Sequence, residues 1–344
     1  MRNAISWLLK ESEGVTALDK CILFFIKAIY LAVRILLRIA LGKKTRDRIY
    51  IKRGYDFGIF WNKAFNLLRR TSNNYTLLRF KMPKYGYEFY CRNNKDDFKV
   101  MTIHEDEIIE RFTPKKGDIV VDIGAHIGLF TIIASKRVGI NGKVIAIEAH
   151  PDSFDILNRN IQLNGLTNVI TLQYAVYSSK KQKMKLYLPG AQSGFTKLNT
   201  VMTDRAQTTE EFVEVYANTL DNLLEQHQQN GIKHEDVNWI KVDVEGAEFE
   251  VLKGATDVLS KTKDIALLIE VHNLHDGTNH YKDIMDFLSF YEFRIEFEKT
   301  YENGEKHIIV RKSNSFQKIL FVVVNSCSLI SSLFLSYFSC FLES

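Results

Sequence analysis

Cysteine is scarce in this chain of 344 residues. The four cysteines are Cys21, Cys91, Cys327 and Cys340. None has the spacing of a CxxC or mixed Cys/His metal site, so we expect a reduced compartment and no bound metal. A secretory signal is lacking as well, because Glu11, Glu13 and Asp19 interrupt the N-terminus before any apolar core begins.

Charge is distributed unevenly along the chain. Residues 1–85 contain 18 Lys/Arg and 5 Asp/Glu, a net charge of +13, and the remainder contains 28 and 36, a net charge of −8. A basic arm of this kind is typical of a surface that docks on an anionic membrane or polymer. The alternative is a solvated basic face.

The N-terminal arm has no long uncharged run. Residues 21–41 are very apolar, but charges interrupt them every few residues, so the segment is too short to span a bilayer. Its basic side chains share one helical face, which predicts a helix in the membrane interface over residues 20–42. A core helix with snorkelling basic side chains, or an oligomer contact, is the alternative.

The C-terminal tail differs from the arm. Residues 319–342 form an uncharged run of 24 residues, about 36 Å if helical, which is long enough for a membrane anchor. Arg311, Lys312 and Lys318 precede it and predict a cytoplasmic main domain. A buried helix or an unstructured apolar extension is the alternative. We therefore expect three parts: a basic arm at 1–84, the main domain at 85–312 and the tail at 313–344.

Apolar strands alternate with helices in the main domain. The expected strands are 119–123, 143–149, 169–176, 212–216, 239–244, 265–271, 293–297 and 306–310. The expected helices are 129–138, 151–164 and 248–259. This order predicts an α/β fold, a doubly wound Rossmann-like sheet of seven strands that is mostly parallel with an antiparallel edge strand.

A glycine loop follows the first of these strands. The run Asp118–Gly128 reads DIVVDIGAHIG, in which Asp122 crosses an apolar strand that ends in the loop Gly124–Gly128. The second glycine of a dinucleotide-binding G-x-G-x-x-G motif is missing, because His126 stands there. Asp122 would repel a phosphate but could hold an ammonium group. The loop therefore favours S-adenosylmethionine over NAD.

An acid at the end of the next strand completes the predicted cofactor site. Glu148 lies 24 residues after Gly124, the distance expected of an acid that binds both ribose hydroxyls, although an ordinary surface acid is the alternative. Ala175 ends the third strand, where small side chains would flank an adenine. The predicted cofactor-binding residues are Asp122, Gly124, Ala125, His126, Gly128, Glu148, Ala149 and Ala175.

Charged residues also converge at the ends of two later strands. Strand alternation places Lys241, Asp243 and Glu245 on one side, and Glu270 and His272 share a face on the next strand. Such charges are costly in buried strands unless they are paired or functional. An internal Lys–Glu network and a divalent metal held by Asp243, Glu245 and His272 are both alternatives to a catalytic site.

Several motifs in order resemble the FkbM family of S-adenosylmethionine-dependent methyltransferases. They are VDIGAHIG, IEAHP, the Asn160–Asn168 segment, Thr219-Leu220-Asp221, KVDVEGAEFEVLKGA and IEVH, over roughly residues 85–311. The resemblance implies a class I methyltransferase fold with cofactor contacts at Asp122, Gly124, Gly128 and Glu148. His126 stands where the family often has Asn.

The resemblance also implies the reaction, transfer of a methyl group to a hydroxyl. We expect an O-methyltransferase for a saccharide or lipid-linked glycan, with the acceptor pocket shaped by residues 178–212. The candidate bases are Asp243 first, as the nearest to the cofactor edge, then His272, whose pKa suits neutral pH, and Glu245. A non-catalytic cofactor-binding module, or a methyltransferase for another small molecule or for nucleic acid, is the alternative. Nucleic acid is not the expected partner, because the apolar arm is unsuited to a phosphate groove.

Overall fold

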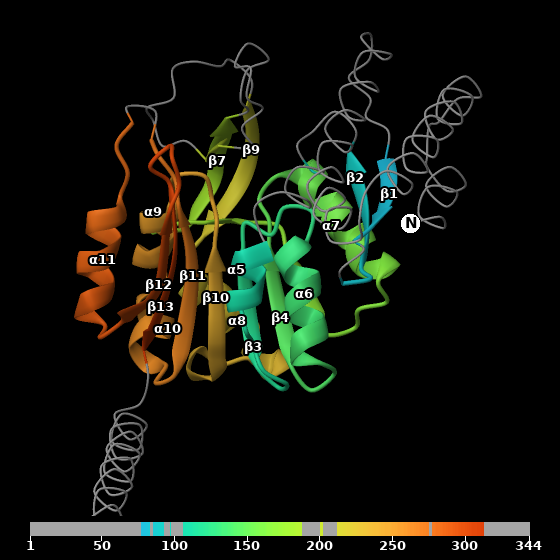
Figure 1. The fold of residues 1–344 in the computed structure, drawn as a ribbon, viewed down its shortest axis with the longest axis horizontal. Helices are drawn as coiled ribbons and strands as arrows, with labels where there is room; N and C mark the ends of the chain where they lie inside the picture. The colour runs from blue at the N-terminus through green and yellow to red at the C-terminus, as the bar shows by residue number, and fades with distance from the viewer. Residues whose placement is uncertain are drawn as a thin grey trace, which may run out of the picture.

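The computed structural model describes residues 77–82, 85–92, 97, 106–187, 200–201, 212–274 and 277–312. Its centre is a seven-stranded sheet in the order β12-β13-β11-β10-β3-β4-β5 (Figure 1). The strands are β3 (Ile119–Ile123), β4 (Lys143–Ile147), β5 (Val169–Leu172), β10 (Val237–Val242), β11 (Ile265–Val271), β12 (Arg294–Thr300) and β13 (Lys306–Lys312). The five strands from β11 to β5 pair in parallel, and the antiparallel hairpin β12–β13 forms the edge next to β11. The predicted fold class is confirmed.

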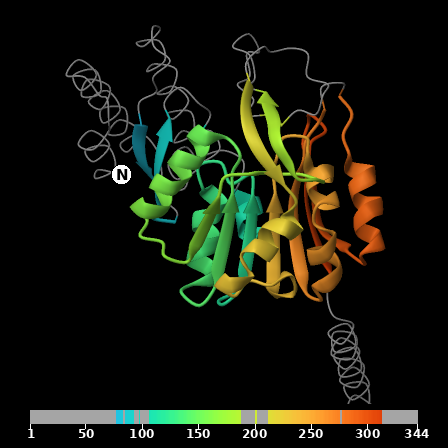
Figure 2. The same ribbon diagram turned by 180° about the vertical axis from the view of Figure 1, so that it is seen from behind.

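Helices cover both faces of this sheet (Figures 1 and 2). One face packs against α5 (Asp106–Arg111) and α6 (Leu129–Val138), and the other packs against α8 (Leu220–Gln226), α9 (Glu248–Lys253), α10 (Thr256–Lys261) and α11 (Tyr281–Phe290). Strand alternation explains the two apolar cores, since Val120 enters the first while Val121 and Ile123 enter the second. Two short 3₁₀ helices, Gln228–Asn230 and His234–Asp236, lead into β10.

A smaller sheet stands beyond the carboxyl ends of the parallel strands (Figure 1). It contains β6 (Ala175–Val176), β9 (Phe212–Asn218), β7 (Lys181–Tyr187) and β8 (Thr200–Val201), in that order. The sequence predicted one strand over residues 169–176. The chain instead leaves the large sheet after β5, and β6 pairs in parallel with β9. Ala175 and Val176 therefore belong to the smaller sheet and not to the large one.

The single helix predicted over residues 248–259 is divided into α9 and α10 at Gly254. A Cβ at Gly254 would lie 2.2 Å from the carbonyl oxygen of Tyr177, so only glycine allows this close approach of the two backbones. The division depends on a contact with a distant segment. The local sequence pattern could not predict it.

An N-terminal hairpin packs against α7 (Pro151–Leu163). Its strands are β1 (Leu77–Lys81) and β2 (Glu88–Arg92), which pair antiparallel. The predicted boundary between residues 84 and 85 lies between β1 and β2 in the sequence, and it stays a prediction. The predicted helix at 20–42 and the predicted anchor at 319–342 lie outside the described residues. Among the helices of the described segments, none has the length and apolarity needed to cross a bilayer.

Asn160 on α7 joins the hairpin to the glycine loop. Its Oδ1 accepts a hydrogen bond from the backbone nitrogen of Tyr90 (2.6 Å), and its Nδ2 donates to the carbonyl oxygens of Tyr90 (3.1 Å) and Ile127 (2.8 Å). The side chain is fully buried. One amide therefore satisfies three backbone groups in two separate segments.

We expect Asn160→Ala to lower the free energy of unfolding by about 2–4 kcal/mol, because it leaves buried backbone groups without partners. Urea denaturation of the full chain measures this. The matched control is Arg159→Ala on the exposed side of the same helix, where an i,i+4 ion pair with Asp155 should contribute less than about 0.5 kcal/mol. Equal losses in the two variants would contradict the assignment.

Candidate functional site

A pocket opens at the carboxyl ends of β3, β4 and β10, beneath the smaller sheet. Its empty volume, open mouth included, is about 880 Å³. Predicted residues in its lining are Gly124, Ala125, His126, Glu148, Ala149, Ala175, Asp243 and Glu245. The prediction did not name Leu129, Phe130, Tyr174 and Leu186, which add apolar and aromatic surface. Asp122, Gly128 and His272 are not in the lining.

The glycine loop passes close to the end of β10. A Cβ at Gly124 would lie 1.8 Å from the carbonyl oxygen of Asp243, and the residue has a φ of 74°, so a side chain is excluded on both grounds. The backbone nitrogens of Gly124 and Ala125 donate to the carbonyl oxygen of Ile147. The loop is thereby fixed between the two strands that flank β3.

Glu148 is held facing the pocket by two backbone amides. Its Oε2 accepts from the nitrogen of His126 and its Oε1 from the nitrogen of His150, both at 2.8 Å. Burial raises the pKa of this carboxyl, and the nearby His126 and the two amides oppose that rise. Each oxygen has a second lone pair, and so the carboxylate can still accept hydrogen bonds from a ligand.

His126 is also contacted from outside the pocket. It adopts a left-handed backbone with a φ of 51°, a conformation in which histidine is enriched among non-glycine residues. Its Nε2 lies 3.0 Å from Nη2 of Arg92, which forms a fully buried ion pair with Asp97 at 2.9 Å. Burial would raise the pKa of Asp97, but His126 and Arg92 hold it well below its usual range. No local pattern marked Arg92 or Asp97 in the sequence.

Asp122 does not face the pocket, contrary to its predicted contact with an ammonium group of the ligand. It is 1% exposed, and its Oδ2 accepts from Oγ1 of Thr131 at 2.5 Å. Its Oδ1 lies 3.5 Å from Nζ of Lys241. Lys241 also donates to the carbonyl oxygen of Gly124 at 2.9 Å and pairs with Asp243 at 3.0 Å. The ammonium group near Asp122 is therefore that of Lys241 and not one from the ligand.

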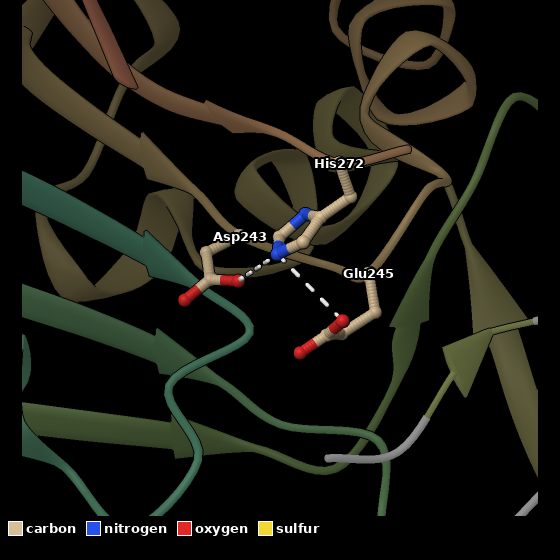
Figure 3. A group of neighbouring side chains, drawn as sticks. All are labelled: Asp243, Glu245 and His272. Carbon is tan, nitrogen blue, oxygen red and sulfur yellow. Dashed lines mark ion pairs between the residues drawn. The ribbon is translucent and has the colours of Figure 1, made fainter. Parts of the chain in front are cut away.

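Asp243, Glu245 and His272 come together beside the pocket, as predicted (Figure 3). Asp243 and Glu245 follow β10, and His272 follows β11. His272 Nε2 lies 3.8 Å from Oδ1 of Asp243 and 3.6 Å from Oε2 of Glu245. One ligand atom from each of the three residues lies within 4.8 Å of the others.

The charges in this group depend on one another. Burial raises the pKa of Glu245 to about 8, and the neighbouring carboxylates of Asp243 and Glu270 add to the rise. Burial alone would lower the pKa of His272, but Glu245, Glu270 and Glu248 raise it well above its ordinary value. A raised pKa makes the neutral imidazole a smaller fraction of His272 near pH 7, which weakens the argument for His272 as the base, and the assignment stays a prediction.

The model for the Methyltransferase FkbM domain matches residues 122–295, just over half of the chain. The chain belongs to the FkbM methyltransferase family. It is an S-adenosylmethionine-dependent methyltransferase, as the sequence motifs predicted.

Relatives support this membership. Over 235 residues the methyltransferase is 27% identical to the hexuronic acid methyltransferase AglP of Haloferax volcanii. The alignment covers 67% of this chain and 87% of AglP. It is 33% identical over 157 residues to methyltransferase sdnD of Sordaria araneosa. The aligned segment makes up 40% of this chain and 60% of sdnD. The chain thus spans less than two thirds of the length of sdnD.

Solved methyltransferases have low overall similarity to this chain. TYW2 of M. jannaschii in complex with AdoMet has a TM-score of 0.39 at 16% identity and covers 70% of this chain and 87% of its own. A SAM dependent methyltransferase from Aquifex aeolicus has a TM-score of 0.32 at 15% identity and covers 60% and 88%. The fold therefore rests on the strand order of this chain itself.

The pocket fits the cofactor, S-adenosylmethionine. Gly124, Ala125 and His126 line the pocket, and the buried carboxylate of Glu148 can accept hydrogen bonds from ligand hydroxyls. Ala149, Ala175 and Val176 offer small apolar surfaces for a flat base. No phosphate-binding glycine pattern is present, in keeping with a ligand that has no phosphate.

We expect Lys241→Met to lower the free energy of unfolding by about 3–5 kcal/mol, since it leaves the buried carboxylate of Asp122 without its counter-charge. The double variant Lys241→Met/Asp122→Asn should recover part of that loss. Urea denaturation of the full chain measures both. The control, Lys253→Met, removes a more exposed ion pair with Glu250. A loss for Lys241→Met no larger than that of the control would refute the role of Lys241.

Proposed function

We propose that the methyltransferase transfers a methyl group from S-adenosylmethionine to a hydroxyl of a saccharide. The observation that carries the proposal is the group of carboxylates Asp243 and Glu245 in the pocket wall, on the β10 side of the glycine loop. AglP, a hexuronic acid methyltransferase, supports a sugar as the acceptor class. A glycan linked to a lipid is the form of acceptor that the basic, apolar arm favours.

The charge of the pocket wall favours a hydroxyl over a carboxyl as the accepting group. A hexuronic acid offers both, but an acceptor carboxylate would have to approach the carboxylate of Asp243 in the pocket wall. Like charges at this range disfavour ionisation of both partners. A neutral hydroxyl meets no such repulsion and can donate a hydrogen bond to a carboxylate.

The roles of the individual residues follow from their positions. S-adenosylmethionine, when bound, supplies a methyl group on a positively charged sulfur. Glu148 accepts hydrogen bonds from the ribose hydroxyls, and Gly124, Ala125 and His126 support the ligand through the loop backbone. Asp243 orients the acceptor hydroxyl and takes its proton as the oxygen–carbon bond forms. We rank Asp243 ahead of His272 because Asp243 lines the pocket and His272 does not.

Glu148→Gln should weaken cofactor binding by about 10–100-fold, because the new amide cannot accept from both backbone nitrogens and the ribose at once. Isothermal titration of the full chain with S-adenosylmethionine measures this. The matched control is Glu214→Gln, an exposed acid on β9 that pairs with Lys183. Unchanged affinity in Glu148→Gln would show that the cofactor does not contact this carboxylate.

The function itself is tested by incubating the full chain with methyl-labelled cofactor and saccharides that contain hexuronic acid. We expect a methyl ether, which survives mild alkali, and Asp243→Asn should slow the transfer by about 10²–10⁴-fold with little change in cofactor affinity. An alkali-labile methyl ester would overturn the hydroxyl assignment. Cofactor binding without transfer to any saccharide would support a different acceptor or a non-catalytic module.

A further inference from the structure

His272 points one ring nitrogen at a group of carboxylates that it does not reach by hydrogen bonds. The side chain is 8% exposed, and its Nδ1 lies 2.9 Å from Oε1 of Glu248, a buried acid that also accepts from the backbone nitrogen of Gly246. This fixes the ring orientation. The Nε2 lies 3.6–3.8 Å from Asp243 and Glu245, and within the described segments it makes no hydrogen bond (Figure 3).

These separations are too long for hydrogen bonds but fit a shared cation. Hydrogen bonds between nitrogen and oxygen are at about 2.7–3.2 Å. Ligand atoms at about 2.0–2.2 Å from a divalent ion lie about 3–4 Å from one another. One atom each of Asp243, Glu245 and His272 lies within 4.8 Å of the others. Side-chain movements of less than about 1 Å would therefore bring these atoms to the separations of ligands on one divalent ion.

The fourth carboxylate near the ring is already engaged. Oε1 of Glu270 lies 3.6 Å from His272 Nε2, but its Oε2 pairs with Nε2 of the buried His307 at 3.1 Å. Glu248 contacts the other ring nitrogen of His272, Nδ1. Histidines that bind metals commonly donate the other ring N–H to a carboxylate in this way.

We infer that Oδ1 of Asp243, Oε2 of Glu245 and Nε2 of His272 form a binding site for one divalent cation in the wall of the pocket, and that the cation displaces the Nε2 proton to solvent as it binds. Two carboxylates and one imidazole suit Mn²⁺ better than Mg²⁺, which takes oxygen ligands. Asp243 and Glu245 line the pocket, so the remaining coordination positions face it.

Such a cation would deepen the proposed function. An acceptor hydroxyl bound to it from the pocket is more acidic and can release its proton to water at the open mouth of the pocket. This consequence rests on the proposed function. The cation site itself rests only on the three side chains and on the orientation of His272.

The test is a titration of the full chain with Mn²⁺. Binding is measured as the loss of the free-ion signal in electron paramagnetic resonance. We expect one bound ion per chain. His272→Asn and Glu245→Gln should each weaken binding by at least about tenfold, and Glu248→Gln should do so through the ring orientation. Glu214→Gln, remote from the site, should bind as the unaltered chain does.

Cofactor titration of each variant shows whether its pocket is folded, and Glu148→Gln provides the reciprocal control, with Mn²⁺ binding retained. Absence of saturable Mn²⁺ binding, or equal binding by His272→Asn and Glu245→Gln, would overturn the inference. Mn²⁺ binding without methyl transfer would defeat the proposed function alone. Methyl transfer that survives EDTA, in a chain that binds no Mn²⁺, would defeat the cation site alone.

Discussion

The buried ammonium group of Lys241 connects every part of the site. It lies between Asp122 below the glycine loop and Asp243 in the pocket wall, and it donates to the carbonyl oxygen of Gly124. Burial alone would lower its pKa, but Asp243 and Asp122 raise it and so favour the charged ammonium form. Two carboxylates could not lie this close to the loop without that charge. The ammonium thus joins the cofactor loop to the acceptor side.

The glycine loop is then fixed from its other side by contacts far apart in the sequence. Glu148 accepts a hydrogen bond from the backbone nitrogen of His126. The buried Arg92–Asp97 pair contacts the His126 ring. Arg92 belongs to the N-terminal hairpin, outside the segment that the family model matches. The geometry of the cofactor loop therefore depends on residues that the family domain does not include.

Much of this fold could be predicted because its signals are local. Continuous apolar runs such as Ile119–Ile123 predicted buried parallel strands, and the rule that ligands bind beyond strand ends selected Glu148 and Asp243. The direction of the Asp122 side chain could not be predicted, since it depends on Lys241, more than a hundred residues later. The contact of Arg92 with His126 and the division of the helix at Gly254 were missed for the same reason: both depend on tertiary contacts.

The charge layout of the pocket matches the charge that moves in the proposed reaction. Positive charge leaves the sulfur and develops on the acceptor oxygen as the methyl group is transferred. Fixed carboxylates accelerate a reaction only where they stabilise the transition state more than the ground state. Asp243 and Glu245 lie on the β10–β11 side, whereas Glu148 lies across the loop at the end of β4. Lys241 neutralises part of the charge of Asp243, and Glu245, with a pKa of about 8, is largely uncharged near neutral pH. The negative charge that remains on Asp243 favours the acceptor end over the sulfonium.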